Sequence, residues 1–225
     1  MPRKSSINIT TNDWESRADE IAAKIIAGGI VLFPTETVYG LGALPNENGV
    51  QLLIDLKLRP KGKPFQLLIS DLDKLGKYGV NPSPLAMKVM ETFWPGPLTI
   101  VLDVTPGLFP FGLAPSGNVG FRMPAHGLCL DLVRRCGGAL AASSANVTGN
   151  PEPRTCSEAL RQFSGRLDAS IDGGPTGDSL HSTVISVRNG DITVIRKGAV
   201  SEARLREVEE SYQASKVSDN NNPNV

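Results

Sequence analysis

Residues 30–43, IVLFPTETVYGLGA, restrict the possible folds of this chain more than any other stretch. The run opens with four apolar residues of high β-propensity, a pattern typical of a buried strand. Pro34 ends that strand, because its nitrogen has no hydrogen to donate to a sheet. Polar groups follow, and Gly40 and Gly42 then allow a sharp turn or a close approach to a ligand. In α/β proteins such strand ends often build binding sites, although these residues could equally be a strand cap and core filling.

Helical and strand-like patterns alternate along the rest of the chain. Helices are expected at 11–27, 83–93, 127–136, 157–163 and 201–212, and over a segment that Asn46 caps and Pro60 ends. Short apolar strand patterns lie between them, and Asn189 and Gly190 mark a hairpin near the end. The alternation predicts an α/β fold, with one twisted mixed sheet and flanking helices in a single domain.

The domain is expected to span residues 11–212. Residues 1–10 precede the first helical pattern and are expected to form a flexible N-terminus. Residues 213–225 are polar and include three consecutive asparagines, so we expect a disordered tail.

Charge and composition exclude several classes of protein. The 225 residues are 40% hydrophobic and 20% charged, which is ordinary for a chain that buries a core. The net charge is +0, so any binding of a polyanion has to be local. The start of the sequence has no signal-peptide pattern, and no apolar run approaches the ~18 residues of a membrane span. Cys129, Cys136 and Cys156 match no zinc spacing, so reduced cysteines in a cytoplasmic protein are expected.

Four cations, Lys57, Arg59, Lys61 and Lys63, fall close together in this otherwise neutral chain. Prolines and a glycine in the same run keep the backbone extended, so the cations are not spread around a helix. A triphosphate needs several cations at close range, with arginine giving bidentate contacts and lysine a point charge. The run is therefore a candidate nucleotide site. The alternative is a solvated basic loop at the C-terminus of a helix.

Three other places could supply polar groups to the same site. Residues 143–146, SSAN, follow an apolar strand, and their small hydroxyls and amide suit phosphate, sugar or amino-acid groups. Arg122 follows a short strand and is a candidate partner for a carboxylate. Ser182 and Arg196 flank the predicted hairpin and could face the same cleft. Each place has a structural alternative. The SSAN run could be an ordinary turn, Arg122 could form a surface salt bridge, and Ser182 and Arg196 could be ordinary polar residues of a hairpin.

Several familiar catalytic motifs do not occur. The sequence has no GxxxxGK[ST] phosphate loop and no GxSxG, and Pro45 stands where a dinucleotide-binding loop requires glycine. His126 and His181 are far apart and lack metal-ligand spacing. We therefore expect no metal site built by the protein, and expect any Mg²⁺ to arrive with a nucleotide.

A series of motifs resembles the YrdC-domain family, the threonylcarbamoyl-AMP synthases, in order and spacing. The motifs are PTETVYGLG at 34–42, KLRP at 57–60, PGPLT at 95–99, RMP at 122–124, SAN at 144–146, STV at 182–184 and RKG at 196–198. The resemblance covers residues 15–200, nearly all of the expected domain. It implies a twisted α/β sheet around a large basic cavity.

The resemblance also implies an activity. Members of this family make L-threonylcarbamoyladenylate from L-threonine, bicarbonate or CO₂ and ATP, and they release pyrophosphate, which makes them nucleotidyltransferases. Mg²⁺ would be carried by the ATP. A separate transferase complex then modifies a tRNA adenosine, and the synthase itself could contact tRNA weakly.

The resemblance implies functional residues by position, most of them within these motifs and three, Lys63, Asn118 and Ala142, between them. The ATP-binding set comprises Lys57, Arg59, Lys63, Asn118, Ser144, Asn146 and Arg196. The threonine-binding set comprises Thr37, Arg122, Ala142 and Ser182. Lys57 and Arg59 would be catalytic, since the reaction needs positioning and charge neutralisation more than an acid–base pair. Arg122 would hold the threonine carboxylate.

The sequence departs from the family pattern at two positions. Leu68 stands where the family usually carries a histidine, which puts one threonine contact in doubt. Leu58 replaces a common glycine between the signature lysine and arginine. The tail is too short for a further domain, so the short, single-domain type is expected.

Three alternatives belong to other functional classes or branches. A YrdC-like RNA-binding protein without synthase activity would use the same basic cavity, but zero net charge and few aromatic residues argue against it. The YciO-like branch typically lacks the SAN and WPGP motifs that are present here. Hydrogenase-maturation proteins carry zinc-finger and acylphosphatase regions that this sequence lacks.

Overall fold

The computed structural model describes residues 6–60, 62–105, 107–109, 113–114, 116–163, 165–176 and 180–220. The strands are β1 (Ile7–Thr10), β2 (Val31–Phe33), β3 (Gly40–Ala43), β4 (Gln66–Ile69), β5 (Leu98–Asp103), β6 (Asn118–Arg122), β7 (Ala139–Ser144), β8 (Ala169–Asp172), β9 (Thr183–Arg188) and β10 (Asp191–Arg196). The helices are η1 (Thr11–Asp13), α1 (Trp14–Ile26), α2 (Glu47–Lys57), α3 (Lys74–Lys77), α4 (Pro84–Phe93), α5 (Gly127–Arg135), α6 (Cys156–Phe163) and α7 (Glu202–Asn220).

Within these residues the strands form one sheet in the order β1-β8-β2-β3-β7-β4-β6-β5-β9-β10. Four pairs are parallel, β1–β8, β2–β8, β4–β6 and β5–β9, and the remaining pairs are antiparallel. The predicted α/β domain with a mixed sheet is therefore confirmed. The hairpin expected at Asn189 and Gly190 joins β9 to β10, and both residues have the positive φ that its tight turn requires.

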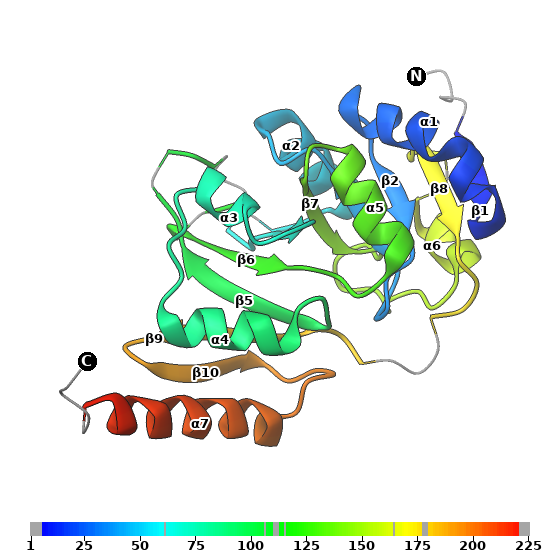
Figure 1. The fold of residues 1–225 in the computed structure, drawn as a ribbon. Helices are drawn as coiled ribbons and strands as arrows, with labels where there is room; N and C mark the ends of the chain where they lie inside the picture. Colours follow the sequence, from blue (N-terminus) through cyan, green and yellow to red (C-terminus); the bar gives the residue numbers. More distant parts are fainter. Residues whose placement is uncertain are drawn as a thin grey trace.

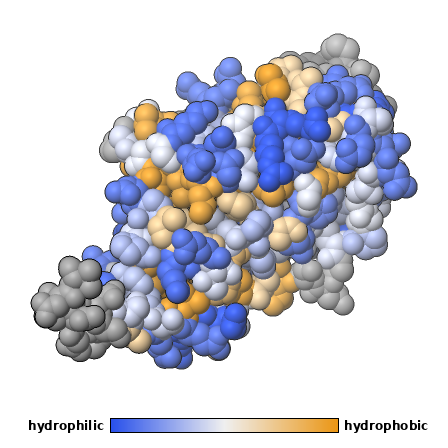
Figure 2. Space-filling model, in the orientation of Figure 1, coloured by the Kyte–Doolittle hydropathy of each residue, from blue (hydrophilic) through white to orange (hydrophobic). Residues whose placement is uncertain are grey.

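Helices cover the two faces of the sheet unequally (Figure 1). Strand alternation sends Leu67 and Ile69 of β4 into a large core on one face, and Leu68 into a smaller core on the other. The smaller core lies beneath α1 and α5, which pack side by side over the half of the sheet that holds β2, β7 and β8. The outward surfaces of α5 and α7 are largely hydrophilic (Figure 2), as expected for amphipathic helices that bury one side.

The smaller core receives no residues from β5, β6 or β9 among those described. These strands bury their other face instead, through residues such as Ile100, Phe121 and Ile185 in the large core. Their second face is consequently not covered by α1 or α5, and it is free to line a cavity.

The prediction of a sharp turn at the glycines after the first strand was wrong. Gly40 and Gly42 lie within β3, which pairs with β2 and β7, and they do not form a turn. A Cβ atom on Gly42 would lie 2.7 Å from Cε1 of Phe33, so the glycine lets the Phe33 ring lie flat on the neighbouring strand. The turn between β2 and β3 falls at residues 34–39 instead.

Both expected domain ends also need correction. Residues 7–10, assigned to a flexible N-terminus, form β1, whose backbone pairs with β8. Helix α7 continues to Asn220, past the expected end at 212, because Gln213, Ala214 and Lys216 are good helix formers. Residues 1–5 and 221–225 lie outside the described residues, as does Lys61 of the basic run.

Candidate functional site

A cavity of about 300 Å³ opens over the part of this same sheet face that α1 and α5 leave uncovered. Its floor includes Gln66 of β4, Gly120 of β6, Val101 of β5 and Val184 of β9. Gly120 pairs with Gln66 on one side and with Val101 on the other, and Val184 pairs with Thr99, two residues before Val101 on the same face. The cavity therefore follows from sheet topology and from where the covering helices stop.

Nearly every residue expected at the site lines this one cavity. The lining residues from the expected ATP-binding and threonine-binding sets are Thr37, Lys57, Arg59, Lys63, Arg122, Ala142, Ser144, Asn146, Ser182 and Arg196. Asn118 is not among the lining residues. It begins β6 beside Asp103, beyond the cavity, and its Nδ2 donates to the carbonyl of Ser116 at 3.4 Å.

Lys57 is almost completely buried, with 1% exposure, at the end of α2. Its ammonium donates to the backbone carbonyls of Ser144 and Asn146, and it lies 3.4 Å from Oδ1 of Asn146. Burial, followed by the neighbouring charge of Arg59, lowers the pKa of Lys57 to about 7. Lys57 thus ties the end of α2 to the loop after β7 and places a desolvated cation at the cavity wall.

The backbone turns sharply directly after Lys57. Leu58 adopts a left-handed conformation with φ of 51° and ends α2. Glycine reaches this conformation without steric cost, and a side chain does not, so the position favours glycine. The turn lets Lys57 and Arg59 both line the cavity.

Arg59 is held by its own loop. Its Nε donates to the carbonyl of Lys63 at 2.9 Å, and Nη2 donates to the carbonyl of Pro64 at 2.5 Å. The guanidinium also lies over the ring of Phe65, 4.4 Å from its centroid. Burial lowers the pKa of Arg59 to about 10, so the side chain still carries its charge at neutral pH. These contacts fix a cation at the cavity before any anion arrives.

The SAN loop after β7 is tied together internally. Ser144 Oγ donates to Oδ1 of Asn146 at 2.7 Å, and Asn146 Nδ2 donates to the carbonyl of Asn150 at 2.7 Å. Its orientation relative to α2 comes from Lys57. The KLRP and SAN motifs, far apart in the sequence, therefore form one wall of the cavity.

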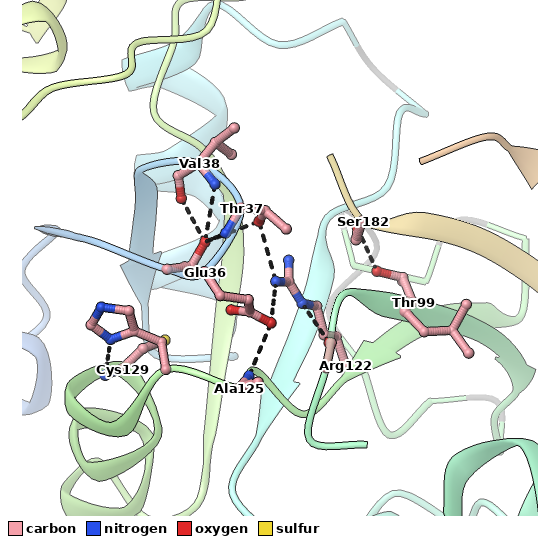
Figure 3. A network of polar contacts seen from close by, with 12 residues as sticks. Glu36, Thr37, Val38, Thr99, Arg122, Ala125, Cys129 and Ser182 are labelled. Carbon is pink, nitrogen blue, oxygen red and sulfur yellow. Dashed lines mark hydrogen bonds and ion pairs between the residues drawn. The ribbon is translucent and has the colours of Figure 1, made fainter. Parts of the chain in front are cut away.

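Arg122 lies at the other end of the cavity, where β6 ends, and it is 3% exposed (Figure 3). Its Nη2 is 2.8 Å from Oε1 of Glu36 and donates to Oγ1 of Thr37 at 3.2 Å. Its Nε donates to the carbonyl of Gly96 at 3.2 Å. The loop between β2 and β3 thus supplies an anionic and a hydroxyl partner to this buried cation.

Ser182 connects Arg196 to the strand floor. The hydroxyls of Ser182 and Thr99 are 3.0 Å apart (Figure 3), and Thr99 donates to Oε1 of Gln66 at 3.1 Å. Arg196 Nη2 donates to the carbonyl and to Oγ of Ser182, at 2.8 and 3.0 Å. Burial lowers the pKa of Arg196. Arg196, Ser182, Thr99 and Gln66 therefore form one hydrogen-bonded series along the strand floor.

Sequence reasoning missed several polar residues of this region. Glu36 was given no chemical role, and Gln66 and Thr99 were read only as strand residues. Glu152, whose Oε2 lies 2.5 Å from Nδ1 of His181, also lines the cavity. Strand alternation could have found Gln66, because it shares the face of Leu68, but no local pattern indicates the other contacts.

Leu68, at the position of the family histidine, is 1% exposed and packs in the smaller core. It does not line the cavity, and the neighbouring lining residue on β4 is Gln66. Leu68 itself therefore offers no polar contact to the cavity.

Cys129, Cys136 and Cys156 are free and buried, and burial raises the pKa of each thiol. Among the described residues, no group of three or more histidines, cysteines or acidic residues is arranged to hold a metal ion. In the same part of the chain, no helix is long and apolar enough to cross a membrane.

Residues 23–198 match the family model Sua5_yciO_yrdC, described as "Telomere recombination". A protein of Bacillus subtilis named threonylcarbamoyl-AMP synthase is 36% identical over 89% of this chain and 58% of its own length. A protein of Pyrococcus abyssi with the same name is 37% identical over 88% of this chain and 57% of its own length. The chain thus spans less than two thirds of the length of these two relatives.

A solved structure gives the same result in three dimensions. The crystal structure of Pyrococcus abyssi Sua5 complexed with L-threonine superposes with a TM-score of 0.84 at 33% identity. The match covers 90% of this chain and 60% of that one. The arrangement of strands around the cavity is therefore shared with a protein that binds an amino acid.

Proposed function

The chain belongs to the Sua5/YciO/YrdC family, and from this membership we propose that it is a threonylcarbamoyl-AMP synthase. The reaction joins L-threonine, bicarbonate or CO₂, and ATP to give L-threonylcarbamoyladenylate and pyrophosphate. The product would serve a tRNA threonylcarbamoyl-transferase complex in the cytoplasm.

One observation carries the proposal. A single cavity is lined at one end by Lys57, Arg59 and Lys63, and at the other by Thr37 and Arg122. Several cations at one end suit a triphosphate, and a hydroxyl beside an arginine suits an amino-acid carboxylate. A ligase-like condensation needs both kinds of site within reach of each other.

The chemistry proceeds by two bond-forming steps. The neutral amine of threonine attacks CO₂, forms an N–C bond and loses a proton, which gives a carbamate. A carbamate oxygen then attacks the α-phosphorus of ATP, and the bond from that phosphorus to the β-bridging oxygen breaks. Pyrophosphate leaves with the electron pair, so the protein has to position the reactants and neutralise the leaving charge.

The end of the cavity lined by Lys57, Arg59 and Lys63, here called the nucleotide end, would neutralise that charge. We assign the triphosphate to Lys57, Arg59 and Lys63, with Ser144, Asn146 and Arg196 as further ATP contacts. Lys57 and Arg59 would stabilise the charge that develops on the departing pyrophosphate. Asn118 is left out of this assignment because it does not line the cavity.

The end of the cavity lined by Thr37 and Arg122, here called the amino-acid end, would select the substrate. Arg122 would bind the threonine carboxylate, and Thr37, Ala142 and Ser182 would surround the rest of the molecule. Mg²⁺ would enter with ATP, bound by phosphate oxygens and water. Glu152 is the carboxylate among the cavity-lining residues that could reach such an ion through water.

The test is pyrophosphate release from ATP and bicarbonate by the full chain, with L-threonine, with L-serine and with no amino acid. We expect release that depends on L-threonine and is weaker with L-serine. Release that ignores the amino acid, or no release, would contradict the proposal. RNA binding with a steep salt dependence and no ATP turnover would instead favour the RNA-binding alternative.

A further inference from the structure

Glu36 is a residue of the loop between β2 and β3 that the proposed reaction does not use directly. Its Oε1 lies 2.8 Å from Nη2 of Arg122 and accepts a hydrogen bond from the amide of Ala125 at 2.9 Å (Figure 3). Its other oxygen, Oε2, is buried without a hydrogen-bond partner among the described residues. A carboxylate that leaves one buried oxygen unsatisfied is costly to keep, which indicates a role other than stability.

The three partners of Arg122 fix most of its donors. Gly96 takes the Nε hydrogen, and Glu36 and Thr37 take those of Nη2. Within the described residues, Nη1 donates no hydrogen bond. The planar guanidinium therefore cannot rotate without breaking contacts to two separate segments of the chain, and Nη1 is the nitrogen left for a ligand.

Of these partners, Glu36 is the charged one, and it is also held by a backbone amide in the loop that follows β6. The amide of Ala125 fixes Oε1, so the carboxylate does not follow Arg122 if that side chain moves. Among the described residues, Glu36 makes the ion pair of Arg122. A buried guanidinium without this pair would seek other acceptors.

We propose that Glu36 is a positioning residue that holds Arg122 ready for a substrate carboxylate. The inference rests on the proposed function, because it takes the Arg122 end of the cavity as the amino-acid site. Glu36 does not touch the substrate. It acts through Arg122 and raises the preference for ligands that carry a carboxylate.

The experiment compares L-threonine with L-threoninol, which lacks the carboxylate, by calorimetric binding to the full chain. The variants are Glu36→Ala, Glu36→Gln and the control Glu207→Ala, which breaks the exposed ion pair between Glu207 and Arg204. We expect Glu36→Ala to weaken threonine binding about 30-fold and to change threoninol binding less than about threefold. Glu36→Gln keeps an acceptor for both Arg122 and Ala125, so it should recover most of the threonine affinity, and Glu207→Ala should match the wild-type protein.

Equal loss of both ligands in Glu36→Ala, or unchanged binding of threonine, would overturn the inference. The assay reads binding without turnover, so it separates this inference from the proposed function. Threonine binding that depends on Glu36, in a protein that releases no pyrophosphate, would contradict only the synthase proposal. A wild-type protein that binds no threonine would contradict both.

Discussion

The two ends of the cavity hold buried cations in opposite ways. Arg122 faces a carboxylate, Glu36, at 2.8 Å. Lys57 faces backbone carbonyls instead and makes no ion pair within the described part of the chain. Both side chains are at most 3% exposed, so the difference lies in their partners and not in their burial.

This difference matches two kinds of ligand. A cation without a counter-ion is electrostatically unfavourable in a low-dielectric wall, and a polyanion relieves that cost when it binds. A cation that already has a counter-ion offers less net charge but a fixed geometry. The nucleotide end is therefore arranged for charge, and the amino-acid end for orientation.

The largest effect is expected from removing the paired cation. Arg122→Ala leaves Glu36 partly buried and unpaired, so we expect a loss of about 3 kcal/mol in the free energy of unfolding. The KM for threonine should rise by about 100-fold, because a charge-assisted contact is lost. Denaturant titration and steady-state kinetics measure the two effects.

Arg122→Lys is the companion variant, since it keeps the charge and should fold better. It cannot reproduce the planar guanidinium contacts, so a threonine KM that stays high indicates that orientation matters. If Arg122→Lys kept the wild-type KM for threonine, charge alone would be enough at this end, and the proposed difference between the two ends would be wrong.

Arg59→Ala tests the other end. Its loop contacts are to backbone carbonyls, so the fold should tolerate the change better than Arg122→Ala. We expect the KM for ATP to rise by roughly 10- to 100-fold, with the KM for threonine nearly unchanged. If both arginine variants altered only the KM for ATP, the assignment of the two ends would be wrong.

The uncompensated charge of Lys57 predicts a pH dependence. With its pKa lowered to about 7 by burial, the free protein is mostly neutral at Lys57 at pH 8. A bound triphosphate favours the ammonium and raises this pKa, so ATP binding takes up protons, and affinity falls as pH rises above 7. Calorimetry at pH 8 in two buffers of different ionisation enthalpy measures the uptake. An ATP affinity that stays constant from pH 6 to pH 9 would contradict this account.

The smallest effect concerns the turn beside Lys57. Leu58 holds a left-handed conformation and is largely exposed, so Leu58→Gly removes steric strain and loses little packing. We expect a gain of about 0.5 to 1 kcal/mol in the free energy of unfolding, after allowing for the greater chain entropy of glycine. Thermal unfolding measures this change. A loss of stability in Leu58→Gly would contradict the prediction and show that the Leu58 side chain makes stabilising contacts.

Motif order and strand patterns predicted much of the fold, and all but one of the residues assigned to the site line the cavity. The KLRP, SAN and STV motifs each follow or precede a strand. Residues next to the ends of neighbouring strands are brought close together once the sheet forms. Strand β1 and its pairing with β8 were not predicted, because four residues at a sheet edge give only a weak strand pattern. Asn118 lies at the start of β6, outside the cavity lining, and its expected role in ATP binding stays a prediction.

The partner of Arg122 could not be read from the sequence. Glu36 and Arg122 are far apart along the chain, and their contact depends on how the loop between β2 and β3 lies against β6. The Glu152–His181 contact likewise joins two loops. Such pairs form through tertiary packing, which the local sequence does not determine.

The most direct test of the two-ended cavity is mass spectrometry of the nucleotide product. The wild-type protein is incubated with ATP, L-threonine and ¹³C-bicarbonate. We expect an adenylate that contains threonine and carries the isotope in its carbamoyl carbon, with pyrophosphate in equal amount. A threonyl adenylate without the isotope, or no threonine-containing nucleotide, would contradict the account.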